Sequence, residues 1–253
     1  MFKIYLFSIL LLFGLHSFCR AELIRVYAAA DLQYALKEIA DLYQREHPED
    51  KVELIFGSSG KGAAQIKAGA PYHLFFSADM KYAEELYKEG YLVTKPKPYA
   101  VGRIVVWVRK DSGLDPSKFP QILLEAKKIV IANWEHAPYG RAAKEVLQNY
   151  EVFDRVKDKL VLGENVSQAA SFVYSGAAEV GIIPLSHAIS ENMKKVGTYF
   201  LIPENKHSPI VQGYGITEAG KNLKGVKKFY EFVLSPKARE ILKKYGFMVP
   251  GEK

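Results

Sequence analysis

Apolar and polar residues alternate along this chain in short blocks that predict strands followed by helices. Residues 24–29 are apolar and rich in β-branched or aromatic side chains, which is typical of a buried strand. Apolar residues then recur at helical spacing across residues 32–45, and His47-Pro48 ends this predicted helix. The first strand is therefore expected to lead through a short turn directly into a helix.

The same alternation continues almost to the C-terminus. Further strands are expected at residues 52–56, 74–76, 103–109, 129–132, 159–162, 180–183 and 210–216. Further helices are expected at residues 63–67, 81–89, 141–148, 167–174, 220–234 and 236–245. Strands that alternate with helices predict an α/β fold with parallel sheets and helices on both faces.

Two interruptions of the pattern predict two lobes. Pro96 and Pro98 interrupt the first half, and a polar stretch at residues 206–209 interrupts the second. We interpret them as crossings between lobes. The first lobe is then discontinuous and comprises residues 22–100 plus 207–253, and the second comprises residues 101–206.

The first 21 residues have the pattern of a secretory signal peptide. Lys3 precedes an apolar run over residues 4–15, and Cys19-Arg20-Ala21 places small residues at the two positions that a signal peptidase reads. Cleavage after Ala21 predicts export to the periplasm, although a retained N-terminal anchor is the alternative. Cys19 is the only cysteine, so the mature chain would have no thiol nucleophile, disulfide or cysteine metal site.

Composition and charge narrow the choice of partners. Apolar residues make up 49% and charged residues 25%, which is ordinary for a soluble globular protein. The formal net charge is +7, but the lysines are scattered among acidic residues and form no basic stripe. Together with export, this argues against nucleic acid as a partner and leaves an anionic ligand open.

Each of four predicted turns joins a strand end to a helix N-terminus, where unpaired backbone N–H groups stabilise an anion. They are Ala30-Asp31, Ser58-Ser59-Gly60, Pro138-Tyr139-Gly140 and Asn165-Val166-Ser167. Ligands of open α/β sheets bind beyond the carboxyl ends of strands, so two facing lobes would bring these turns to one cleft. Taken alone, Ser58-Ser59 is as well explained by helix capping, because serine is a preferred N-cap residue.

Catalytic and metal-binding motifs do not fit. Gly60-Lys61-Gly62 lacks the glycine spacing of a P-loop, and Ser59 lacks the second glycine of a nucleophile elbow. The histidines have no paired metal spacing, and Glu135-His136 is better explained as structural. We therefore expect a binding protein and not an enzyme; an exported hydrolase is the alternative from another class.

The chain resembles the periplasmic molybdate-binding proteins of molybdate ABC transporters. The matching segments are VYAAADLQYALKEIA, FGSSGKGAAQIKAGAP, LFFSAD, EHAPYGRAAKEVL, GENVSQAASFVYSGAAEVGI and FYEFVLSPKAREILKKYGF. The resemblance implies a two-lobed type II periplasmic binding protein fold, with mixed sheets flanked by helices and a ligand cleft between the lobes. It also implies capture of molybdate or tungstate, without a cofactor, and delivery to an ABC transporter permease by a monomeric protein.

The same resemblance implies which residues contact the oxyanion. These are Asp31, Ser59, Tyr139 and Val166, with Ala30, Ser58 and Gly60 beside them. They would touch the oxygens of molybdate or tungstate and would not bind a bare metal ion.

Two positions depart from the family pattern. Asp31 stands where the family often has serine or another neutral polar residue, and a carboxylate repels a divalent anion. We expect Asp31 to cap its own helix, or to contact the ligand through its backbone N–H only. Pro184 stands where some members have a tyrosine whose hydroxyl reaches the anion, so that contact is absent here. Tyr139 would contact the anion through either its hydroxyl or its backbone N–H. Asp31 would be an acceptor for a protonated ligand, so phosphate is the alternative oxyanion, with sulfate.

Overall fold

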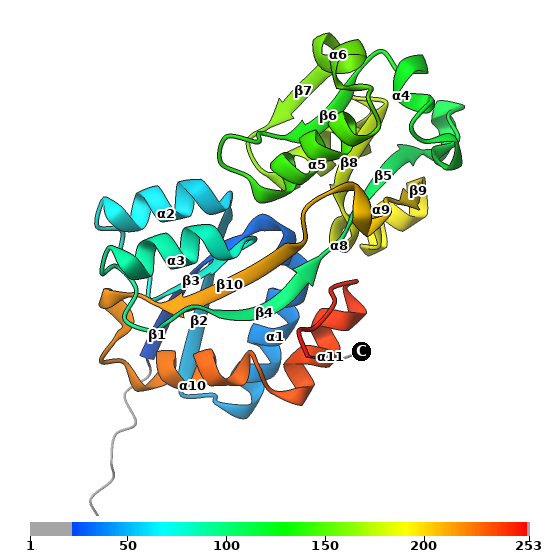
Figure 1. Ribbon diagram of the computed structural model, residues 1–253. Helices are drawn as coiled ribbons and strands as arrows, with labels where there is room; N and C mark the ends of the chain where they lie inside the picture. Colours follow the sequence, from blue (N-terminus) through cyan, green and yellow to red (C-terminus); the bar gives the residue numbers. More distant parts are fainter. Residues whose placement is uncertain (1–21, 252–253) are drawn as a thin grey trace, which may run out of the picture.

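The computed structural model describes residues 22–251 of the 253-residue chain. The predicted signal peptide lies outside the described residues. Two five-stranded sheets, each covered by helices, lie one above the other, and the chain passes between them along β4, β5 and β10 (Figure 1). Among the described residues, no helix is both long and apolar enough to span a bilayer.

The first sheet has the strand order β2-β1-β3-β10-β4. Its strands are β1 (Glu22–Ala29), β2 (Asp50–Gly57), β3 (Leu74–Ser77), β4 (Lys97–Gly102) and β10 (Ile210–Ile216). The helices that accompany it are η1 (Ala30–Leu32), α1 (Gln33–Glu46), α2 (Ser59–Lys67), α3 (Met80–Lys88), α10 (Lys224–Phe232) and α11 (Pro236–Lys244). This sheet draws on residues from both ends of the chain.

The second sheet has the strand order β7-β6-β8-β5-β9. Its strands are β5 (Ile104–Arg109), β6 (Ile129–Ala132), β7 (Leu160–Gly163), β8 (Val180–Pro184) and β9 (Gly197–Leu201). Its helices are α4 (Ile122–Glu125), α5 (Pro138–Asn149), α6 (Phe153–Val156), α7 (Val166–Ser175), α8 (Leu185–Ala188) and α9 (Glu191–Val196). The exact lobe boundaries at residues 101 and 207 stay a prediction.

The sheets are mixed, so the prediction of purely parallel sheets from the strand–helix alternation is wrong. β1 pairs in parallel with β2 and β3, but β10 is antiparallel to β3 and β4. In the second sheet, β5 is antiparallel to β8 and β9. The reason is the crossing between sheets: β10 returns from the second sheet and enters the first one from its carboxyl end. The implied mixed-sheet fold is confirmed.

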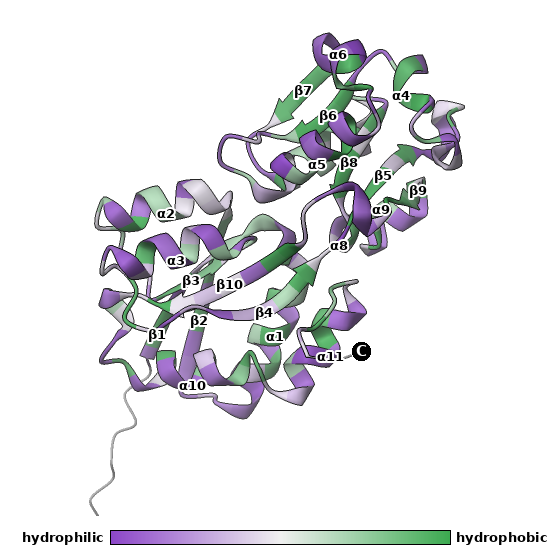
Figure 2. Ribbon diagram, viewed as in Figure 1, coloured by the Kyte–Doolittle hydropathy of each residue, from purple (hydrophilic) through white to green (hydrophobic). Residues whose placement is uncertain are grey.

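Clusters of buried apolar residues cover both sheets. Figure 2 shows the strands of the second sheet as largely hydrophobic and the helices as a mixture of hydrophobic and hydrophilic residues. Ile24, Val26 and Leu74 are fully buried in the first sheet, and Val106, Ile129 and Ile131 in the second. Strands buried on both faces explain the continuous apolar runs in the sequence. β4 and β9 were missed because their polar and proline residues hide the strand pattern.

Gly140 sets how closely the N-terminus of α5 approaches β6. A Cβ atom at this position would lie 2.3 Å from the backbone oxygen of Ala132, which cannot move away without shifting the strand. We expect Gly140→Ala to destabilise the protein by about 1–3 kcal/mol, measured by urea unfolding. Gly213→Ala is the matched control, because the added Cβ would meet only the flexible end of Met80. Equal losses in both variants would contradict this account.

Candidate functional site

The four predicted turns meet at one small cavity between the two sheets. Its volume is about 10 Å³, the size of a site for one small occupant and too small for an organic substrate. It is lined by Ala29, Ala30, Asp31, Gly57, Ser58, Ser59, Ala78, Ala137, Pro138, Tyr139, Asn165 and Val166. Seven of these residues lie at or just after the ends of strands of the first sheet and five follow strands of the second, so both lobes contribute to the site.

Helix N-termini supply the positive potential of this cavity. η1 leading into α1 follows β1, α2 follows β2, α5 follows β6 and α7 follows β7. Each helix begins with backbone N–H groups that lack partners within the helix and carry partial positive charge. None of the described residues that line the cavity is a lysine or an arginine. The cavity therefore suits an anion that is held by dipoles and hydroxyl groups.

The structure brings six of the seven expected residues to this cavity. They are Asp31, Ser59, Tyr139 and Val166, together with Ala30 and Ser58. Gly60 is the exception: it does not line the cavity, and its N–H donates to the backbone oxygen of His136 at 2.9 Å. This N–H holds the two lobes together and has no hydrogen left for a ligand.

Both serines of the second turn have hydroxyl hydrogens to offer. The Ser59 Oγ accepts a hydrogen bond from the Ala78 N–H at 2.9 Å, which leaves its own hydrogen for another acceptor. The Ser58 Oγ is buried and has no hydrogen-bond partner among the described residues. Ser58 stands at the N-cap position of α2, yet its side chain makes no capping bond, so the alternative of helix capping is wrong for this residue. A buried hydroxyl without a partner is costly and indicates a ligand.

Asp31 is fully buried at the edge of the cavity. Its Oδ2 accepts a hydrogen bond of 2.6 Å from the Gln212 Nε2, and its Oδ1 has no partner among the described residues. Burial raises the pKa of Asp31 to about 7, and the hydrogen bonds from Gln212 and Tyr139 limit that rise. The expectation that Asp31 caps its own helix is wrong, because Asp31 lies within η1 and the N-cap residues of η1 and α1 are Ala29 and Leu32. The reason is that Gln212 holds the carboxyl group toward the first sheet.

Gln212 and Tyr99 complete this network, and the sequence reading missed both. The Tyr99 hydroxyl donates to the Gln212 Oε1 at 2.6 Å, so the Gln212 Nε2 faces Asp31 and also reaches the Tyr139 hydroxyl at 3.1 Å. Burial raises the pKa of Tyr139 well above its usual value, so its hydroxyl keeps its proton. Because this hydroxyl is engaged in the network, the backbone N–H of Tyr139 is the better ligand donor. The signal for Gln212 in the sequence is that it is a polar residue within the otherwise apolar strand β10.

In the fourth turn, one residue caps the helix and the next residue lines the cavity. The Asn165 side chain accepts a hydrogen bond of 3.1 Å from the Gln168 N–H and caps α7. The next residue, Val166, is buried at the first position of the helix, where its backbone N–H faces no helical acceptor. Pro184 ends β8 and does not line the cavity.

Several contacts hold the two halves of the site together. The Ser186 hydroxyl donates to the backbone oxygen of Asp31 at 2.8 Å. Ion pairs also join the lobes on either side of the cavity: Lys61 with Glu164, and Asp79 with Arg141. The structure is thus a closed conformation, in which the two lobes contact each other around the cavity.

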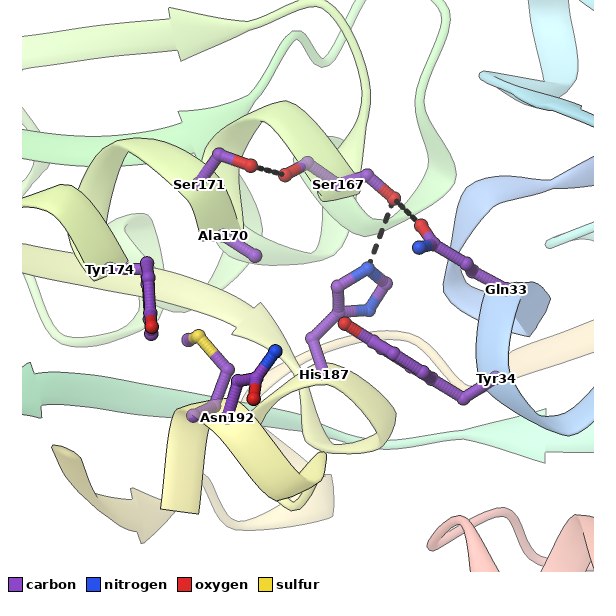
Figure 3. A pocket seen from close by; sticks show the side chains of 9 residues that line it. Gln33, Tyr34, Ser167, Ala170, Ser171, Tyr174, His187 and Asn192 are labelled. Atoms are coloured by element: carbon purple, nitrogen blue, oxygen red, sulfur yellow. Dashed lines mark hydrogen bonds between the residues drawn. The ribbon is translucent and has the colours of Figure 1, made fainter. Parts of the chain in front are cut away.

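A larger pocket of about 190 Å³ opens beside the cavity, between α1, α7, α8 and α9 (Figure 3). Ser167 lies between Gln33 and His187 there, with its Oγ 2.8 Å from the Gln33 Oε1 and 3.1 Å from the His187 Nε2. This is a serine–histidine contact, but the His187 Nδ1 has no partner among the described residues. Burial lowers the pKa of His187 to about 4, which makes it a weak base. The pair lacks the third group that orients a catalytic histidine.

The described residues also include no candidate site for a metal ion. In residues 22–251, no group of three or more histidine, cysteine, aspartate or glutamate side chains could hold a metal ion. The fold and the cavity together define a two-lobed protein with a small cavity, surrounded by helix N-termini, between its lobes.

Comparison with known proteins places this chain in a family. Residues 24–248 match the family model described as bacterial extracellular solute-binding protein, and the chain belongs to this family. It is 34% identical over 221 residues to the molybdate-binding protein ModA of Rhodobacter capsulatus, covering 87% of this chain and 86% of that protein. It is 33% identical over 229 residues to ModA of Azotobacter vinelandii, covering 90% of each.

A solved structure supports the same assignment. The Azotobacter vinelandii periplasmic molybdate-binding protein superimposes with a TM-score of 0.84 at 32% identity, covering 90% of this chain and 99% of that one. The expected fold and the expected family are therefore confirmed.

The buried Asp31 predicts a pH-dependent stability for the ligand-free protein. The pKa of Asp31 is about 7 in the folded state, against an ordinary value of 3.8. Ionising this buried carboxyl group is therefore harder in the folded than in the unfolded protein. The stability that goes with the neutral group is fully present below about pH 4 and is lost as the pH rises through 7. Asp31→Asn does not titrate. We expect it to be more stable than the parent by on the order of 2 kcal/mol at pH 8, with little difference at pH 4.

Thermal melting in buffers free of oxyanions would measure this difference. Asp50→Asn is the matched control: Asp50 is also buried, bonds to the Tyr43 hydroxyl at 2.6 Å and lies outside the cavity. A difference between Asp31→Asn and the parent that is the same at both pH values would refute the assigned cause.

Proposed function

We propose that this protein is an extracytoplasmic receptor that captures molybdate or tungstate and delivers it to an ABC importer. The observation that carries the proposal is the buried, unpartnered hydroxyl of Ser58 in a cavity surrounded by helix N-termini and without a cation. The relatives named molybdate-binding proteins, at 33–34% identity over most of the chain, support this ligand class.

The donor set favours a fully deprotonated oxyanion. The backbone N–H groups of Tyr139 and Val166 can only donate, and the hydroxyls of Ser58 and Ser59 each have a hydrogen to donate. Molybdate, tungstate and sulfate have acceptors only, and size separates sulfate from the other two. Phosphate is the second candidate, because the unpartnered Oδ1 of Asp31 could accept its proton.

The same arguments support a transport role without catalysis. The serine–histidine contact described above lacks a catalytic third group among the described residues. We propose a monomer that acts in the periplasm, without a cofactor, and presents its closed form to a membrane permease. Hinge closure of two lobes around a solute is an established mode for binding proteins of this kind.

Ligand titrations provide the first test. Trp134 precedes α5 and packs against the core of the second sheet, so lobe closure should change its fluorescence. We expect residues 22–253 to bind molybdate and tungstate saturably, with sulfate and phosphate much weaker. Ligand at 100 times its dissociation constant should add about 2.7 kcal/mol to the free energy of unfolding. Binding of none of the four anions would refute the proposal.

Ser58→Ala tests the observation that carries the proposal. Because the Ser58 Oγ has no partner among the described residues, its removal breaks no hydrogen bond within the protein. We expect the melting temperature without ligand to stay unchanged, while molybdate affinity falls about tenfold, the effect of one lost hydrogen bond. Ser117→Ala, at an exposed position of the second lobe, is the control for affinity. Unchanged affinity in Ser58→Ala would exclude this hydroxyl as a ligand donor.

A further inference from the structure

The two oxygens of Asp31 have different environments. The Oδ2 accepts the Gln212 Nε2 hydrogen bond at 2.6 Å, while the Oδ1 is buried without a partner among the described residues. The residue is 0% exposed and lines the cavity. A buried carboxyl oxygen with no partner is a costly arrangement unless a ligand completes it.

The surrounding network sets which oxygen remains for the ligand. The single hydrogen of the Tyr99 hydroxyl goes to the Gln212 Oε1, at 2.6 Å, which is closer than the Ser77 backbone oxygen at 3.2 Å. An oxygen that accepts from Tyr99 places the Gln212 amide nitrogen on the Asp31 side. The Oδ2 is therefore held by a donor in every protonation state, and only the Oδ1 can change its role.

The charge of the site favours a neutral Asp31 when a dianion is bound. No cation opposes the effect of burial on its pKa, which is about 7 before any anion arrives; a nearby negative charge raises it further. Lys37 is turned away, with its Nζ over the Phe56 ring. The other titratable groups on the elements around Asp31 are Tyr99 on β4, Tyr139 on α5, Tyr34 on α1, His187 on α8 and the ion pair of Asp79 with Arg141.

We propose that Asp31 is a specificity-determining residue that binds the oxyanion as a neutral carboxylic acid, with its Oδ1–H donating to one oxygen of a fully deprotonated tetrahedral anion. This inference rests on the proposed function. When Asp31 is ionised before binding, the proton comes from the solvent, so the complex forms with uptake of up to one proton. A like-charge repulsion is thereby replaced by a hydrogen bond.

The same proton discriminates between oxyanions. A hydrogen phosphate ion carries its own P–OH donor, which would meet the Oδ1–H donor of a neutral Asp31. An ionised Asp31 could accept that hydrogen, at the cost of the repulsion between charges. The preference for molybdate over phosphate is therefore greatest at low pH and declines as the pH rises.

Calorimetric titration of the protein with sodium molybdate between pH 6 and 9 tests the inference. Only the protonated form binds, so the apparent affinity should be constant near pH 6 and fall about tenfold per pH unit above pH 7, about a hundredfold by pH 9. Repeating the titration at pH 8 in buffers of different ionisation enthalpy should show uptake of close to one proton.

Two variants assign the proton to Asp31. Asp31→Asn has an amide that donates at every pH, so its molybdate affinity should be within a few-fold of the parent at pH 6, constant to pH 9, and without proton uptake. Asp50→Asn, at a buried site outside the cavity, should keep the pH dependence of the parent. Melting temperatures without ligand establish that both variants are folded.

The outcomes separate this inference from the proposed function. Tight molybdate binding by the parent that does not change between pH 6 and 9, or a pH dependence that survives in Asp31→Asn, overturns the role of Asp31 and leaves the receptor function standing. Absence of molybdate binding by the parent at every pH overturns both. Loss of pH dependence and of proton uptake in Asp31→Asn alone supports the inference.

Discussion

The site depends on holding negative charge in a buried cavity that contains no cation. Removing an ion from water is costly, and the protein must replace its hydration with fixed donors. In the proposed site the donors are the first N–H groups of helices that follow β1, β2, β6 and β7, together with the hydroxyls of Ser58 and Ser59. Such groups keep their orientation because each helix follows directly from a strand of a packed sheet. A cavity of about 10 Å³ leaves little room for any occupant other than a small ion.

This arrangement links ligand binding to the closure of the lobes. Asp31, Ser58 and Ser59 come from the first sheet and its helices, while Tyr139 and Val166 come from the second. Neither half alone surrounds an anion. The Gly60–His136 hydrogen bond and the ion pair of Lys61 with Glu164 form only when the lobes meet, so they add to the stability of the closed form. Surface ion pairs contribute little each.

Asp31 differs from the other polar groups that line the cavity because it has a carboxyl group, which can lose its proton. A carboxyl group is tolerated there because Gln212, on the crossing strand β10, and Tyr139, from the second lobe, bind it on one side. The strand that joins the lobes thus also sets the orientation of a ligand-facing group. A change in the protonation of Asp31 would alter both the electrostatics of the cavity and the contact between the lobes.

The sequence by itself determined most of the strand–helix order and the four turns, because hydrophobic periodicity and N-terminal helix signals are local. Through the resemblance of their motifs it also predicted Asp31, Ser59, Tyr139 and Val166 as ligand contacts, and all four line the cavity. Only the tertiary structure decided that β10 runs antiparallel to β3, that Gly60 bonds across the lobes and that Asp31 is bound by Gln212 and caps no helix. Those outcomes depend on pairs of residues far apart in the chain, up to 181 positions for Asp31 and Gln212, whose contact no local pattern encodes.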